Sequence, residues 1–164
     1  ALVSAIDPVI AVIYPKIVRA FSDGEAAALR YAARWAVLGG VLGLCILGAG
    51  VMAWPLVQSH LSARSGGMDV DRLHSIFMVL GWLLPLLMGW KFLGYWMLAS
   101  GRYDRAYRSC VVIGGGIGLL GALIAGGAAG ALGLAWTAVV AEIAVVFAAI
   151  TGVWLTRRNS SNAL

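Results

Sequence analysis

Four long apolar stretches constrain the fold of this chain more than any other feature of its sequence. They lie at residues 35–55, 73–99, 110–132 and 134–155. Each is long enough to cross the hydrocarbon core of a bilayer, which takes about 20 helical residues. Backbone polar groups find no water in lipid, so segments of this kind must be helical. The sequence therefore predicts an all-α, polytopic membrane protein with four transmembrane helices.

The overall composition agrees with a protein that lies in lipid. Hydrophobic residues make up 62% of the 164-residue chain, charged residues make up only 12%, and the mean hydropathy is +0.92. This balance excludes an ordinary soluble domain. The formal net charge of +5 falls in the connections and tails, so it indicates membrane topology. We do not expect a nucleic acid as a partner.

Positive charges set the predicted orientation. They gather before the first stretch, between the second and the third, and after the fourth: Lys16, Arg19, Arg30, Arg34, Arg102, Arg105, Arg108, Arg157 and Arg158. The connection after the first stretch balances its arginines with aspartates, and the one after the third carries no charge. Cytoplasmic loops carry an excess of Lys and Arg, so we expect both termini in the cytoplasm and the chain in a bacterial inner membrane.

The two ends of the chain differ from the spans. Residues 1–21 form an apolar lead, punctuated by proline and basic near its end, which is typical of an amphipathic segment in the membrane interface. A docking arm for a partner subunit is the alternative. Ser22 and Glu25 match a capping box, so we expect a four-helix bundle over residues 22–158. Residues 159–164 are predicted to form a disordered tail.

The third stretch is unusually rich in glycine. Eight glycines fall in it, namely Gly114, Gly115, Gly116, Gly118, Gly121, Gly126, Gly127 and Gly130. Small residues let neighbouring helices approach closely within a membrane. This density predicts a third helix that is buried between its neighbours, with a cofactor lying against it as the less favoured alternative.

A histidine stands at the head of the second stretch and begins a stripe along one helical face. At about 100° per residue, His74, Met78, Gly81, Pro85 and Gly89 share that face. The stripe joins a potential metal ligand to glycines at which a flat group can approach the backbone. A haem site on a helix needs this combination. A plain helix-packing face is the competing interpretation.

This helix and the connection after it resemble the second helix and following loop of haem-copper oxidase subunit I, including its short stand-alone relatives. The matching positions are His74, Met78, Pro85, Gly89, Gly101, Asp104, Ala106 and Tyr107. The resemblance implies that His74 is an axial ligand of a low-spin haem near the outer face, and we expect a b-type haem. Gly81 and Gly89 would form a low wall, and Trp82 would pack beside the macrocycle.

The chain also departs from that family. Arg108 replaces the family's loop proline, and no histidine follows His74. The family's oxygen-reducing centre uses histidines from later helices, so we expect no copper site and no oxygen reduction by this chain alone. A second haem ligand would come from His74 of a second copy, from a partner subunit, or from Met52, since His and Met together hold haem iron in some cytochromes. Met68 is a weaker candidate.

These observations lead to two main functional hypotheses. The first is a haem-binding integral membrane subunit that passes electrons within a larger respiratory or redox complex. The second is a structural accessory subunit without a cofactor. A third, a small transporter or quinone-binding protein, would centre on Glu142, because a carboxylate within a membrane span is a candidate functional group. Glu142 is equally well explained as a neutral group bonded to Ser, Thr or Trp. The expected partners are the lipid bilayer and other membrane subunits or a second copy.

Overall fold

The computed structural model describes residues 7–64 and 69–161, and it is helical throughout that part apart from short connections. No strand occurs in these two ranges. Three helical stretches within them are long and apolar enough to cross a membrane: Glu25–Leu61, Val70–Ser100 and Asp104–Arg158. The all-α class is therefore confirmed for the described residues, and helices long and apolar enough to span a membrane are present.

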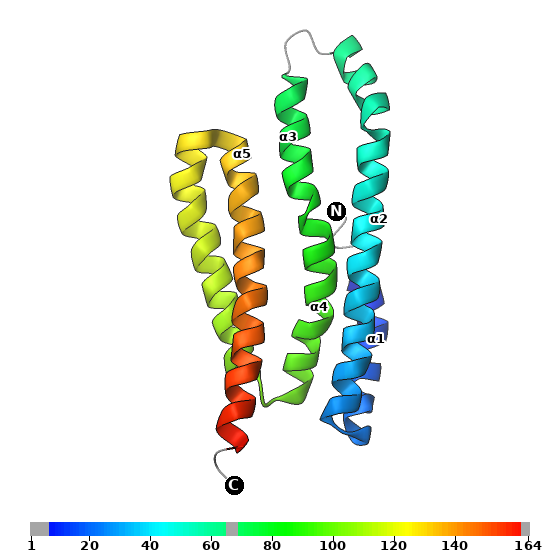
Figure 1. The fold of residues 1–164 in the computed structure, drawn as a ribbon, viewed down its shortest axis with the longest axis vertical. Helices are drawn as coiled ribbons and strands as arrows, with labels where there is room; N and C mark the ends of the chain where they lie inside the picture. Colours follow the sequence, from blue (N-terminus) through cyan, green and yellow to red (C-terminus); the bar gives the residue numbers. More distant parts are fainter. Residues whose placement is uncertain (1–6, 65–68, 162–164) are drawn as a thin grey trace.

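The helices stand side by side along one long axis (Figure 1). In chain order they are α1 (Asp7–Ala20), the short 3-10 helix η2 (Phe21–Asp23), α2 (Glu25–Arg64), α3 (Val70–Gly81), α4 (Leu83–Ser100) and α5 (Asp104–Ser161). The predicted second span corresponds to α3 and α4, which are separated only at Trp82. Pro85 has no N–H to donate to the carbonyl of Gly81, and this accounts for the break one turn before it.

The long helix α5 folds back on itself at Gly130. This residue has φ 60° and ψ −140°, a conformation that glycine adopts without steric cost. Figure 1 shows the chain reversing there, so α5 is an antiparallel pair, a first arm (residues 104–129) and a second arm (residues 131–161). A Cβ on Gly121 would meet the side chain of Thr137, and one on Gly126 would meet that of Leu134. Glycines thus let the two arms pack closely. The turn at Gly130 lies three residues before residue 133, the predicted boundary between the third and fourth spans.

The first arm of α5 is not buried between neighbours, contrary to the sequence-based prediction. Val112, Leu123 and Ile124 are each at least 70% exposed. Figure 1 places this arm at the edge of the molecule, with the second arm between it and α3–α4 over most of its length. Only the glycines that face the second arm take part in packing within the chain. The prediction was wrong because glycine density does not reveal on which sides a helix has neighbours.

The helix α1 packs along the N-terminal half of α2 (Figure 1). Its buried side carries Ile10, Ile13 and Ile17, each at most 5% exposed, against α2 and α4. Its outer side carries both apolar and basic residues, for example Val12 and Lys16. The predicted place of residues 1–21 in the membrane interface stays a prediction, and residues 1–6 lie outside the described part.

The predicted capping box at the start of the bundle is absent. Ser22 lies in η2, and its Oγ donates a hydrogen bond to the carbonyl of Arg19 at 2.6 Å. Gly24, with φ 106°, turns the chain, and α2 begins at Glu25. The Glu25 carboxylate accepts a hydrogen bond from Tyr103, far away in the sequence, so it does not reach back to Ser22. At the other end, α5 continues through Ser161, so residues 159–161 of the predicted tail are helical.

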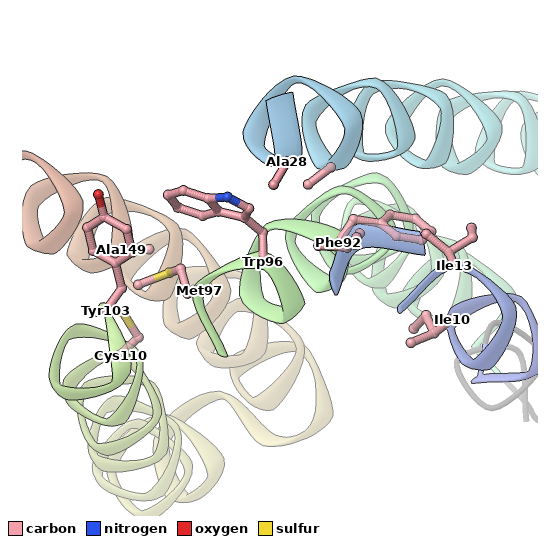
Figure 2. Close-up of a cluster of buried hydrophobic side chains, with 11 residues drawn as sticks. Ile10, Ile13, Ala28, Phe92, Trp96, Met97, Tyr103, Cys110 and Ala149 are labelled. Atoms are coloured by element: carbon pink, nitrogen blue, oxygen red, sulfur yellow. The ribbon is translucent and has the colours of Figure 1, made fainter. Parts of the chain in front are cut away.

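The best-packed region lies at the end of the molecule where α4 turns into α5. Its largest fully buried side chains include Trp96, Met97, Tyr103 and Cys110, each at most 2% exposed. Figure 2 shows these side chains between α4, α5 and the start of α2. The remaining length of the helices buries few side chains within the chain. Its apolar surface must therefore be covered by lipid or by other proteins.

We expect Gly43→Ala to destabilise the protein by about 1–3 kcal/mol, the usual cost of overpacking. A Cβ on Gly43 would lie 2.6 Å from the backbone of Pro85, so α2 and α4 would have to separate. Gly48→Ala is the matched control in the same helix, because a Cβ there meets nothing within 4 Å. It should leave stability unchanged or slightly raised. Thermal unfolding in detergent micelles, followed by tryptophan fluorescence, measures both, and equal midpoints would contradict the packing described.

Candidate functional site

Asp69 caps the N-terminus of α3. The Asp69 side chain accepts a hydrogen bond from the backbone N–H of Arg72 at 3.0 Å, which satisfies one of the unpaired donors of the first turn. The helix therefore starts at Val70, slightly earlier than the predicted span. This start places His74 in the second turn of α3, beside the C-terminal half of α2.

His74 stacks on a tryptophan of the neighbouring helix. The ring centroids of His74 and Trp54 are 4.7 Å apart, and the ring planes differ by 18°. Phe77 stacks on the same indole, with centroids 5.4 Å apart and planes 21° apart. Trp54 is itself only 9% exposed. One face of the imidazole is therefore covered and its plane is held, while the ring nitrogens lie on its edge.

The glycines of the predicted haem face contact α2. A Cβ on Gly81 would meet the side chain of Leu47, and one on Gly89 would lie 3.3 Å from the carbonyl oxygen of Ala36. The intervening proline, Pro85, lies against Gly43 in the same way. The stripe that begins at His74 is thus the face by which α3 and α4 pack on α2. A macrocycle cannot occupy the same space as this helix.

The structure does not bring Met52, one of the candidates for the second ligand, to His74. Met52 is 83% exposed, and it precedes Trp54 by two positions, which turns it about 200° away on a helix. Met78 is partly buried and Trp82 is 54% exposed at the α3–α4 break. Met68 lies outside the described residues. Within residues 7–64 and 69–161, no group of three or more His, Cys, Asp or Glu side chains is placed to hold a metal.

These residues therefore offer a haem only one axial ligand, the imidazole of His74. Only His74 offers a fixed ligand-type ring, and the two glycines expected to face the macrocycle face α2. The described part of the chain does not form a complete haem pocket by itself. Any iron bound at His74 would need its other axial ligand from outside the described part of this chain.

Glu142 lies in the second arm of α5 and is partly buried. Among the described residues, no hydrogen bond or ion pair joins its carboxyl group to the expected Ser, Thr or Trp partners. Thr137, the nearest hydroxyl residue before it in the sequence, instead donates to the carbonyl of Gly133 at 2.9 Å. Glu142 therefore has no partner among residues 7–64 and 69–161 with which to build a site.

A charged cluster that the sequence did not reveal joins the start of α2 to both ends of α5. The Tyr103 hydroxyl donates to Glu25 Oε1 at 2.6 Å, and Arg102 Nη1 donates to Glu25 Oε2 at 3.3 Å. Arg157, near the end of α5, donates from Nε to the Tyr103 hydroxyl at 3.3 Å and pairs with Glu25 at 3.6 Å. The only signal in the sequence was an acidic residue on the side predicted to be basic.

Burial and this cluster together favour the neutral form of Tyr103. Tyr103 has no exposed surface, and removal from water raises the pKa of its hydroxyl group above the ordinary value near 10. The hydrogen bond to the Glu25 carboxylate raises this pKa further, because a phenolate cannot donate it. The nearby Arg157 acts in the opposite direction and has the smaller effect.

Comparison of the chain with protein-family models, with curated proteins and with solved structures finds no match. The resemblance to haem-copper oxidase subunit I therefore rests on the sequence motif alone.

We expect Tyr103→Phe to cost about 1.5–3 kcal/mol at neutral pH, the range for a hydrogen bond to a charged group. Because the folded pKa of Tyr103 lies above the unfolded value, this contribution is fully present below pH 10 and disappears as pH rises through the folded pKa. Unfolding midpoints of the two proteins should therefore converge in strong alkali. Tyr14→Phe, in an exposed ring of α1, is the control and should behave like the unaltered protein at every pH.

Proposed function

We propose that the chain crosses the bilayer four times, with each arm of α5 forming one span. Each arm exceeds the roughly 20 residues that a span requires. Figure 1 shows the end of α5, the α4–α5 turn and η2 at one end of the molecule, with the turn within α5 at the other. Basic residues such as Arg102 and Arg157 belong to the first of these ends, and the turn at Gly130 carries no charge. This distribution supports cytoplasmic termini.

We propose further that the protein is a structural subunit of a larger membrane complex. The observation that carries this proposal is that the stripe from His74 to Gly89 is used for packing on α2, so the chain needs no cofactor to fill it. A second observation supports docking to another helix. Gly115 and Gly118 lie on one side of the first arm of α5, and a Cβ on either would meet nothing within 4 Å.

Open glycines of this kind suit the close approach of a helix from another subunit. We therefore expect Gly115→Leu and Gly118→Leu to reduce the amount of chain that migrates in a large complex. Leu120→Phe, at an exposed position on the opposite side of the same arm, is the control and should leave assembly unchanged. Blue-native electrophoresis of mildly solubilised native membranes measures the effect. A chain that migrates alone before any substitution would refute the structural-subunit proposal.

A second candidate function is electron transfer through a b-type haem shared with another chain. It is favoured by the stacked imidazole of His74, since an axial ligand must be held in a fixed plane, and by the motif that His74 begins. In this proposal His74 supplies one ring nitrogen, and Trp54, which Phe77 also contacts, holds the ring. Because Met52 is 83% exposed, the other ligand would come from outside the described residues, and we propose that it belongs to a second copy or a partner subunit of a respiratory or redox complex.

A reduced-minus-oxidised spectrum and a pyridine haemochrome assay separate the two candidates. A shared haem predicts an α-band with at most one haem per two chains in a homodimer, and its loss in His74→Ala. His60→Ala is the control, because His60 is exposed on α2 and should leave the band intact. If no α-band accompanies the folded complex, and His74→Ala assembles normally, the structural subunit is the remaining proposal.

A further inference from the structure

The outward face of α2 carries two arginines directly beside an apolar surface. A hollow of about 560 Å³ lies on this face, and the described residues that line it all belong to α2: Arg30, Ala33, Arg34, Val37 and Leu38. Both arginines are exposed, and Val37 and Leu38 are each more than half exposed. Figure 1 shows α2 at the edge of the molecule away from the two arms of α5. This face therefore meets whatever surrounds the helices.

The two arginines have no counter-charge within the described part of the chain. No hydrogen bond or ion pair there involves the side chain of Arg30 or Arg34, and Asp23 of η2 pairs with neither. Glu25, the nearest acidic residue of α2, is paired with Arg157. At about 100° per residue, Arg30 and Arg34 lie about 40° apart around the helix, whereas Glu25 lies about 140° or more from both. Two guanidinium groups one helical turn apart thus face outward together.

The apolar part of this face suits lipid chains better than a packed protein helix. At the same level of α2, Gly39 and Gly43 lie against the backbone of α4. The outward positions instead carry Val37, Leu38 and Val41, all more than half exposed. Small residues permit close contact between membrane helices, and here α2 uses them within its own chain. Branched aliphatic side chains leave an uneven surface that flexible acyl chains can fill.

The direction of α2 carries both arginine side chains toward one end of the molecule. Each Cα–Cβ bond of a helix tilts toward its N-terminus, and the N-terminus of α2 lies at the end that we propose to be cytoplasmic. Arg34 lies about 6 Å deeper than Arg30 along the helix axis, a distance that a long arginine side chain spans when it extends toward the interface. Both guanidinium groups can thus approach one phosphate, while Val37 and Val41 stay beside the acyl chains.

We propose that this face of α2 binds one anionic phospholipid, with its phosphate at Arg30 and Arg34 and an acyl chain along Val37 and Val41. Basic residues at the cytoplasmic ends of membrane helices attract anionic headgroups. A neutral lipid would leave the two charges without a counter-charge, and a second copy docked by the same face would bring two more arginines to them. The inference rests on the proposed topology only for the leaflet, and it does not depend on the proposed assembly or on a haem.

Native mass spectrometry of the full chain, purified in detergent and given equal amounts of phosphatidylglycerol and phosphatidylcholine, tests the proposal. We expect one retained lipid per chain, with phosphatidylglycerol preferred at least about fivefold, because each cation beside an anionic headgroup contributes a preference of about that size. Equal retention of the two lipids would overturn the proposal. Dimers that form in place of the lipid-bound chain would also overturn it and would assign the face to a second copy. Detergent micelles have no leaflets, so a failure here would leave the proposed topology standing.

Two double variants locate the bound lipid. Arg30→Gln with Arg34→Gln removes both charges from the face and should abolish the preference for phosphatidylglycerol. Arg105→Gln with Arg108→Gln is the matched control, since it removes the same charge from exposed positions near the start of α5 and should leave the preference unchanged. Equal loss of preference in both variants, or no loss in the first, would overturn the assignment to this face. The lipid preference of the unaltered protein tests the proposal even if a variant fails to fold.

Discussion

The close approach of α2 and α4 is the interaction on which the other contacts of this protein depend. At Gly39 and Gly43 a Cβ would lie 2.8 Å and 2.6 Å from the backbone of Met88 and Pro85. Backbones that come this near gain dispersion contacts that larger side chains would prevent. The same contact fixes the register of α2 against α3, and it thereby sets Trp54 against His74.

Much of the architecture could be predicted from the sequence because membrane spans are encoded in simple lengths of apolar residues. The breaks were harder to place. Gly130 rather than residue 133 makes the turn in α5, since many glycines in that stretch could adopt a positive φ and the sequence does not distinguish them. The start of α2 was missed for a different reason. Ser22 and Glu25 have the spacing of a capping box, but Tyr103 and Arg157 recruit the carboxylate.

The candidate site shows where reading one helix at a time fails. A histidine followed by small residues on one face has the same pattern whether that face meets a cofactor or a neighbouring helix. Gly81 and Gly89 face a neighbouring helix and not a cofactor, because they lie against Leu47 and Ala36. Leu47 and Ala36 belong to α2, so the pattern within α3 and α4 does not reveal them. Trp54 was likewise invisible as the partner of His74, because their contact depends on how two helices align. The Glu25 cluster joins residues almost the whole length of the chain apart, so no local pattern could have indicated it.

The connection between α4 and α5 divides the molecule into two helical hairpins. One is made of α2 with α3–α4, and the other is made of the two arms of α5, which turn at Gly130. Arginine contacts join the two hairpins at both ends of the molecule. Arg72 reaches the turn at Gly130, where a Cβ would lie 3.1 Å from its guanidinium, and Arg157 reaches Glu25 at the far end. During synthesis the first hairpin can enter the membrane before the second exists. Both contacts join residues of different hairpins, so neither can form until the second hairpin has been made.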